Sequence, residues 1–195
     1  MQVVEELFLE IDRQWPREPA TKIRLSVIGC GALLLQANYE RGTKDSDVFE
    51  TVDLLDDTKH RLVQIAGPGT DLHRRRKLYI VANGLPFLPH VPVWRPVPSL
   101  NAVLERLDVV VLDVVDVVVS KLKRYHANDQ SDIDAMIDLG LVSHDRLLER
   151  FRAAVDEFSG DARAQDLSKY VAHLHRVERD MLGVAESEIE LPSWI

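Results

Sequence analysis

The sequence predicts an α+β fold in which a small mixed sheet flanked by helices is followed by a helical C-terminal half. Short runs of branched apolar residues, which favour strands, occur at 23–28, 78–82 and 107–112. Beyond these runs the apolar residues recur at helical spacing, between serine and glycine boundaries. We therefore expect an α/β core over residues 1–112 and a helical region over 113–195 that packs on this core.

Composition limits the class of protein. The chain has 195 residues, with 24 Lys and Arg against 32 Asp and Glu, and its net charge of −8 argues against a basic nucleic-acid coat protein. The single cysteine, Cys30, excludes an internal disulfide framework and suits a reducing cytoplasm. The longest apolar block, 109–119, is too short and too charged to span a bilayer. We expect a cytoplasmic protein with no membrane partner.

Element boundaries before residue 112 follow from glycines and prolines between apolar runs. Pro16 and Pro19 end an amphipathic first helix, because proline cannot donate to the helical hydrogen-bond ladder. The five prolines between 86 and 98 predict an extended connection without regular structure. The expected elements are a helix over about 2–14, a strand over 23–28, a sharp turn at 29–31, a helix over 32–39, a strand over 45–51, a helix over 56–66 and strands over 78–82 and 107–112.

The elements after residue 112 are expected to be helices. Ser131 and Ser143 stand where a helix needs an N-cap, and Gly140 and Gly160 break the pattern. The first of these helices has one apolar stripe of valines, with charged residues such as Asp116 on the other face. The expected helices cover 113–125, 131–139, 144–158 and 161–185.

A first cluster of candidate functional residues lies where the strand 23–28 ends. The glycine turn of Gly29, Cys30 and Gly31 opens a helix, whose N-terminal N–H groups and positive partial charge suit a phosphate. Asp45 and Asp47 are two residues apart at the start of the next strand and so share one face. Two carboxylates on one face are suitable ligands for Mg²⁺ that bridges triphosphate oxygens, and two such ions allow in-line displacement at phosphorus.

A second cluster begins on the helix predicted over 113–125. Lys121 lies at the edge of the apolar stripe, where its stem packs while its ammonium reaches a cleft. Arg124 follows on the same helix, and Asp129 and Asp132 come directly after it. The alternative for this cluster is a plain amphipathic helix with an interhelical salt bridge.

The two clusters together resemble the signature of the polymerase-β-type nucleotidyltransferase superfamily. The matching residues are Gly29-Cys30-Gly31-Ala32-Leu33, then Arg41-x-Thr43-Lys44-Asp45-x-Asp47, then Lys121 and Arg124 on a helix followed by Asp129-x-x-Asp132. The pattern is similar to that of the AbiEii/MenT-like toxins and of related uncharacterised bacterial nucleotidyltransferase-like domains. The resemblance covers about 23–51 and 107–137.

The resemblance implies transfer of a nucleotidyl group from a nucleoside triphosphate, with Mg²⁺ or Mn²⁺, to an RNA, protein or small-molecule acceptor. Asp45 and Asp47 are then the metal ligands and catalytic carboxylates. Lys121 contacts phosphate, and Asp129 or Asp132 orients it or completes the site. The residues that the resemblance assigns to nucleotide or phosphate binding are Gly29, Cys30, Gly31, Thr43, Lys44 and Arg124.

Two departures from the family pattern keep a second interpretation open. Cys30 stands where most active members have glycine or serine, and the strand 78–82, where a third carboxylate is expected, contains none. Asp108 and Asp113 flank the strand 107–112 and could substitute. The alternative is a catalytically degenerate nucleotide-binding or protein-interaction module, with a protein partner in a toxin–antitoxin or phage-defence system. A third alternative is a structural α+β protein whose Asp-x-Asp is an ordinary turn.

A basic run, Arg74-Arg75-Arg76-Lys77, stands out in this acidic chain. It has two interpretations: a local patch that meets phosphates of RNA or of a nucleotide, or a solvated charged turn before a strand.

Overall fold

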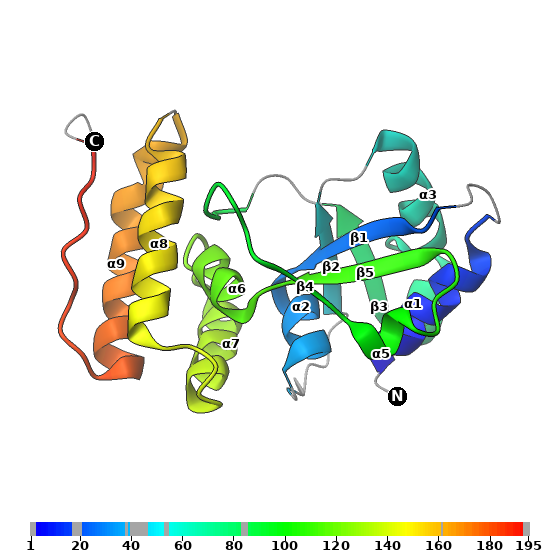
Figure 1. The fold of residues 1–195 in the computed structure, drawn as a ribbon, viewed down its shortest axis with the longest axis horizontal. Coiled ribbons are helices and arrows are strands. Elements are labelled where there is room, and N and C mark those ends of the chain that lie inside the picture. Colours follow the sequence, from blue (N-terminus) through cyan, green and yellow to red (C-terminus); the bar gives the residue numbers. More distant parts are fainter. Residues whose placement is uncertain are drawn as a thin grey trace. The chain divides into compact units, whose positions relative to one another are not determined.

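The computed structural model describes residues 3–16, 21–37, 39, 47–52, 55–82, 86–160 and 162–192. The chain forms two compact units (Figure 1). The first comprises 1–85 and 94–112, and the second comprises 86–93 and 113–195. This division and the predicted one share the boundary after Leu112, and they differ over the segment 86–93.

In the described part of the first unit, five strands form one mixed sheet in the order β3-β2-β1-β5-β4. Their bounds are β1 Ile23–Ile28, β2 Asp47–Val52, β3 Leu78–Ala82, β4 Trp94–Pro96 and β5 Leu107–Leu112. Strand β1 is antiparallel to β2 and parallel to β5, β3 is parallel to β2, and β4 is antiparallel to β5. The predicted α+β class is thereby confirmed.

The helices of the first unit pack against the strands of this sheet and against one another. They are α1 Val3–Gln14, α2 Gly29–Gln36, α3 Asp56–Ala66, α4 Asp71–Arg76 and α5 Pro98–Asn101. Helix α1 packs against α2, α3 and α4, and α2 packs against β1, β2 and β5. Alternate residues of a strand share a face, and Leu25, Val27, Val109 and Val111 share one that is completely buried.

A buried carboxylate of α1 fixes the start of β5. Asp12 is 4% exposed and accepts hydrogen bonds from the backbone N–H groups of Glu105, Arg106 and Leu107 at 3.1, 2.8 and 2.9 Å. The guanidinium of Arg106 also donates to the carbonyl oxygen of Asp12 at 2.9 Å. Because a buried charge is tolerated only when it is fully hydrogen-bonded, Asp12 determines where the chain enters β5.

The proline-rich connection contains more regular structure than predicted. Trp94–Pro96 forms β4, and α5 follows with Pro98 at its first position, where the missing N–H costs nothing. The side chain of Asn101 continues the pairing of β5, because it donates to the carbonyl of Val109 and accepts from its N–H, both at 2.8 Å. The amide side chain thus adds to the long hydrogen bond, 3.4 Å, that the N–H of Val97 donates to the carbonyl of Val109.

The second unit is helical and includes the segment 86–93. Its elements are α6 Val114–Lys121, α7 Ala127–Asp138, α8 His144–Phe158, a 3₁₀ turn Ala162–Asp166, α9 Leu167–Val177 and a π-helical turn Glu178–Leu182. Phe87 packs edge-on against Phe151 and Phe158, with ring centroids 5.5 and 5.0 Å apart. These contacts explain why Pro86–Val93 belongs to this unit.

Helix α6 is buried on nearly all sides, so the predicted polar face is wrong. Asp116 is 1% exposed, and its carboxylate receives two hydrogen bonds from Arg150 on α8 at 2.6 and 2.7 Å. The backbone N–H of Val93 donates to the same carboxylate at 2.8 Å. This ion pair raises the pKa of Arg150 and joins α6, α8 and the segment 86–93.

Other helix boundaries also differ from the prediction, and α6 ends at Lys121 rather than at residue 125. Helix α7 begins at Ala127 rather than Ser131, because Asp129 accepts the N–H of His126 at 3.3 Å and so caps the first turn four residues earlier. The helix predicted over 161–185 is instead divided into the 3₁₀ turn, α9 and the π-helical turn, and Gly183 ends it with a left-handed φ of 64°.

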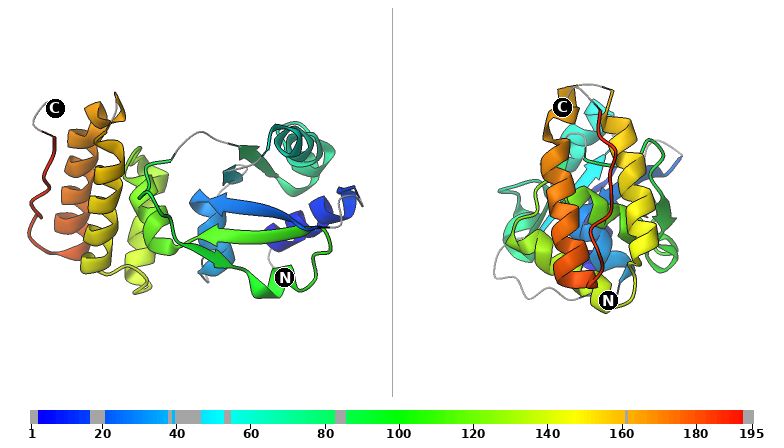
Figure 2. Two further views of the ribbon diagram at one scale, coloured as in Figure 1. Left: turned by 45° about the horizontal axis from the view of Figure 1, so that its top comes forward. Right: turned by 90° about the vertical axis from the view of Figure 1, so that its left-hand side faces the viewer.

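After Gly183 the chain is extended, and residues 183–192 run lengthwise between α8 and α9 (Figure 2, right). Glu178 is 0% exposed and accepts hydrogen bonds from the backbone N–H of Ser187 at 3.0 Å and from the ring of His144 at 2.8 Å. Burial raises the pKa of Glu178, but the hydrogen bonds of Ser187 and His144 outweigh burial, so that the pKa is lowered.

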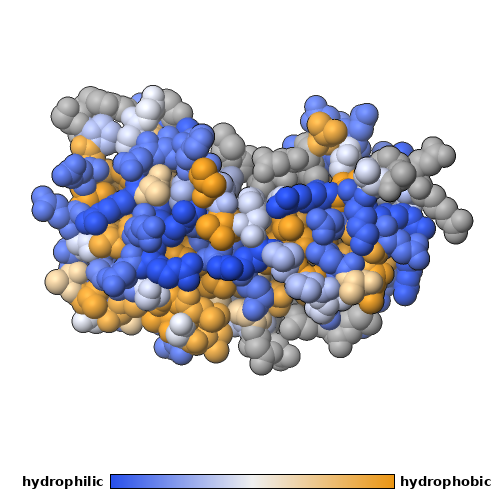
Figure 3. All heavy atoms as spheres, in the orientation of Figure 1, coloured by the Kyte–Doolittle hydropathy of each residue, from blue (hydrophilic) through white to orange (hydrophobic). Residues whose placement is uncertain are grey.

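No helix among the described residues is long and apolar enough to cross a membrane. Hydrophilic side chains cover much of the face shown in Figure 3, over the helices as well as the sheet.

Replacing Asp12 with alanine should lower the free energy of unfolding by about 3 kcal/mol, because three backbone N–H groups lose their acceptor. Urea unfolding followed by circular dichroism measures this loss. Arg13→Ala, at an exposed neighbouring position, is the control and should change stability by about 0.5 kcal/mol or less. A loss below about 1 kcal/mol in Asp12→Ala would contradict the role of the carboxylate.

The lowered pKa of Glu178 predicts a pH dependence of stability. The ionised carboxylate contributes fully above its unfolded pKa of 4.5, and this contribution disappears as the pH falls through the folded pKa. Wild type should therefore be more stable than Glu178→Gln at pH 6, and the difference should shrink toward pH 3. Urea midpoints across this range measure the effect. Glu188→Gln, which changes an exposed carboxyl of the same segment, should follow the wild-type profile.

Candidate functional site

The candidate phosphate cradle is the junction of β1 and α2. Gly29 has a φ of 64°, a left-handed conformation that glycine adopts without strain, and α2 begins at this residue. The predicted turn over 29–31 is therefore the first turn of the helix, which ends at Gln36 rather than at residue 39. Ile28 occupies the N-cap without a side-chain hydrogen bond, so the N-terminal N–H groups of α2 receive no cap from it.

Strand β2 begins beside this junction. In the antiparallel pair, Ile28 lies opposite Glu50. Because the pair is antiparallel, Asp47, the first residue of β2 and three residues before Glu50, lies toward the end of the sheet where β1 passes into α2. Helix α2 also packs against β2. The second aspartate of the Asp-x-Asp motif therefore enters the sheet next to the start of α2, within one unit.

The remaining residues predicted for this site come directly before β2 in the sequence. Thr43, Lys44 and Asp45 lie outside the described residues. Two carboxylates two residues apart provide the hard oxygen donors that Mg²⁺ prefers, so the donor set fits this ion. Within the described ranges, no group of three or more His, Cys, Asp or Glu residues is placed to hold a metal.

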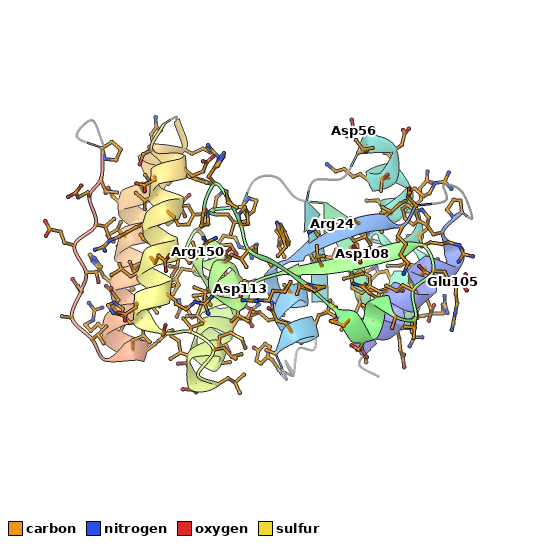
Figure 4. All side chains as sticks on the ribbon, in the orientation of Figure 1. Arg24, Asp56, Glu105, Asp108, Asp113 and Arg150 are labelled. Carbon is orange, nitrogen blue, oxygen red and sulfur yellow. The ribbon has the colours of Figure 1, made fainter. Side chains whose placement is uncertain are left out.

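The structure places the candidates for a third carboxylate on other elements. Strand β3, the neighbour of β2, has the sequence LYIVA and contains no acid. Asp108 lies on β5 opposite Arg24 of β1, so that β1 separates it from β2 (Figure 4). Asp113 caps α6 by accepting the N–H of Val115 at 3.1 Å, and Arg146 donates to it at 3.5 Å. Asp113 is thus engaged in the second unit.

The second cluster is a buried ion-pair group of the helical unit. Lys121 and Asp132 are 5% and 0% exposed, and the ammonium lies 2.7 Å from Asp132 and 3.1 Å from Asp129. Arg124 has a side chain that is 57% exposed, and it reaches Asp129 at 3.4 Å. The structure brings these four predicted residues together. Their contacts form the interhelical salt bridge that was the alternative to a functional site. A phosphate contact of Lys121 stays a prediction.

The three arginines of the basic run lie in a helix, and each pairs with a carboxylate. Arg74–Arg76 belong to α4, so the interpretation of the run as a charged turn is wrong, and Arg76 pairs with Glu6 and Glu10 of α1. Arg75 also contacts Glu10, at 3.0 Å. Burial raises the pKa of Glu10, but the two arginines outweigh it and the net pKa is lowered. The run therefore attaches α4 to α1.

The partners of the basic run were not identified from the sequence. Glu6 and Glu10 are four residues apart and so lie on one helix face, a spacing that signals a shared cationic partner. No comparable signal marks Arg150 as the partner of Asp116, because the two residues lie on different helices far apart in the chain.

Residues 5–181 match a family described as "nucleotidyltransferase of unknown function (DUF6036)". The chain belongs to this family. No curated protein and no solved structure gives a significant match. The nucleotidyltransferase family match includes residues of both units and both predicted clusters. The predicted nucleotidyltransferase-like family is confirmed, and the AbiEii/MenT-like branch stays a prediction.

Lys121→Met should strongly destabilise this nucleotidyltransferase-family protein, by about 3–5 kcal/mol, because two buried carboxylates lose their cation. Chemical denaturation measures the loss. Arg124→Met removes a mostly exposed partner of the same Asp129 and should cost about 1 kcal/mol or less. Equal losses in the two variants would show that the buried ammonium has no special role.

Proposed function

We propose that the protein transfers a nucleotidyl group from a nucleoside triphosphate to a hydroxyl or phosphate acceptor, with Mg²⁺ or Mn²⁺. The observation that supports this proposal is the antiparallel pairing of β1 and β2, which puts the start of β2 at the same end of the sheet as the glycine start of α2. Membership of a nucleotidyltransferase family supports the reaction class. A helix start beside a carboxylate pair suits a triphosphate and its metal ion.

The residues of this region have distinct proposed roles. Backbone N–H groups of Gly29, Cys30 and Gly31 bind phosphate oxygens, because the start of α2 carries positive partial charge. Asp45 and Asp47 would hold the metal ion, which supplies charge neutralisation of the triphosphate. Thr43 and Lys44, which precede β2 in the sequence, add phosphate contacts. Catalysis of this kind depends on positioning and on fixed charges.

In the proposed reaction, an acceptor oxygen attacks the α-phosphorus of the triphosphate and forms a new P–O bond. The bond from the α-phosphorus to the bridging oxygen breaks, and pyrophosphate leaves. The proton of a hydroxyl acceptor passes to a base. RNA, protein and small molecules remain candidate acceptors, and the motif order leads us to propose kinship with the AbiEii/MenT-like toxins.

A second candidate function is a nucleotide-binding or protein-interaction module that has lost catalysis. Strand β3 favours it, because the neighbour of β2 carries no carboxylate. The pairing of Lys121 with Asp129 and Asp132 also favours it, since the ammonium already has two buried partners. A role beside a protein partner in a toxin–antitoxin or phage-defence system belongs to this candidate.

Calorimetric titration of each nucleoside triphosphate, with and without Mg²⁺, tests nucleotide binding. Wild type should bind at least one triphosphate in the presence of Mg²⁺. Asp45→Asn/Asp47→Asn should bind roughly 100-fold more weakly, because the metal loses two charged ligands. Asp56→Asn/Asp57→Asn, a matched exposed pair at the start of α3, is the control and should bind like wild type. Absence of binding by folded wild type would overturn the proposed function.

Transfer of label from α-labelled triphosphates to RNA or protein separates the two candidates. Labelled product that disappears in Asp45→Asn/Asp47→Asn supports the enzyme. Binding without any transfer supports the non-catalytic module.

A further inference from the structure

Side chains of the surface between α8 and α9 hold the extended segment 183–192 through the main-chain groups of the segment. The N–H of Ser187 donates to Glu178 at 3.0 Å, and the ring of His175 meets the carbonyl of Ser187 at 3.0 Å. Arg152 of α8 donates to the carbonyl of Glu188, also at 3.0 Å. Contacts of this type recognise an extended backbone of almost any sequence.

Charge adds a preference for acidic side chains. The segment carries Glu186, Glu188 and Glu190 at alternate positions. Arg179 pairs with Glu186 at 2.7 Å, and His175 lies 3.5 Å from the same carboxylate. Basic side chains therefore complement the segment at Glu186, whereas Glu188 and Glu190 border a cavity that Asp156 also lines.

The fit of the segment is incomplete. Its residues are exposed or only half-buried, so it contributes little apolar burial. An open cavity of about 400 Å³ lies beside it and is lined by Arg152, Val155, Asp156, Glu188, Ile189 and Glu190. A side chain larger than Ile189 at this position would fill space that the chain's own segment leaves empty.

His144, Glu178 and Ser187 do not form a nucleophilic relay. The Nε2 atom of His144 lies 2.8 Å from Glu178 and 3.3 Å from the hydroxyl of Ser187. A relay needs the two partners on different ring nitrogens, because one orients the imidazole while the other exchanges a proton. The contacts among these three residues are therefore explained by the binding of segment 183–192.

We infer that the α8–α9 surface is a binding site for an extended acidic peptide of a partner protein, and that segment 183–192 occupies it as an intramolecular competitor. The main-chain contacts supply affinity, the acid at position 186 supplies charge complementarity, and the cavity beside Ile189 supplies specificity. A second copy of this chain would bring isoleucine to the same position and leave the cavity equally unfilled, which favours a partner of different sequence.

Full-length Ser187→Pro is the test variant. Proline lacks the N–H that Glu178 accepts, yet it keeps the backbone extended, so the segment should detach while the helices stay folded. Ser187→Ala retains this N–H and is the matched control. The probe is a fluorescein-labelled peptide of residues 184–192, with one version carrying Ile189→Trp and another with the three glutamates replaced by glutamine. Fluorescence anisotropy measures binding, and far-UV circular dichroism checks the fold.

Ser187→Pro should bind the native peptide at least tenfold more tightly than wild type or Ser187→Ala, because the apparent affinity scales with the fraction of open sites. The Ile189→Trp peptide should bind severalfold more tightly, and the glutamine peptide severalfold more weakly. Equal affinity of the three proteins, or no binding to folded Ser187→Pro, would overturn the inference. If wild type forms dimers and the peptide dissociates them, the occupant of the α8–α9 surface would instead be a second copy of the chain.

Discussion

A carboxylate remains in a protein interior only if other groups compensate its charge completely, and this requirement organises both units. Asp12 meets it with three backbone N–H groups, and so determines where β5 begins. Asp116 meets it with Arg150 and the N–H of Val93, and so attaches a proline-rich connection to the helical unit. Either carboxylate left without partners would cost several kcal/mol. Elements distant in the sequence are therefore joined by polar contacts as well as by apolar burial.

The elements that the sequence could predict are those whose signals are local. Strand β1 at 23–28, α3 at 56–66, β5 at 107–112 and α8 at 144–158 coincide with the predicted bounds, because their signals are local. The burial of Asp116 depends on Arg150 of another helix, and local patterns carry no information about such a partner, so the predicted polar face of α6 was wrong. The early start of α7 depends on Asp129 in its own first turn, a local capping signal that the prediction of a Ser131 cap did not use.

The position of the candidate site in the sheet could be predicted in part, and its function stays a prediction. The glycine turn and the Asp-x-Asp motif lie close in the sequence, and the antiparallel pairing of β1 and β2 brings the start of β2 to the end of the sheet where α2 begins. The partners of Lys121 were predicted correctly as residues of one cluster, since they lie within about one helical hairpin. The pairing of the arginine run with α1 was not predicted, because it joins residues far apart in the chain.

The strand order has a consequence for synthesis of the chain on the ribosome. Strand β1 is made early, but its parallel neighbour β5 is made only after the remaining strands and the connection 86–93. Long-range parallel pairing of this kind slows folding. Until β5 emerges, one edge of β1 has no partner, and open strand edges favour association with other chains. A fragment that stops before residue 107 would keep this edge open permanently, so the sheet unit cannot be obtained by cutting the chain after β3.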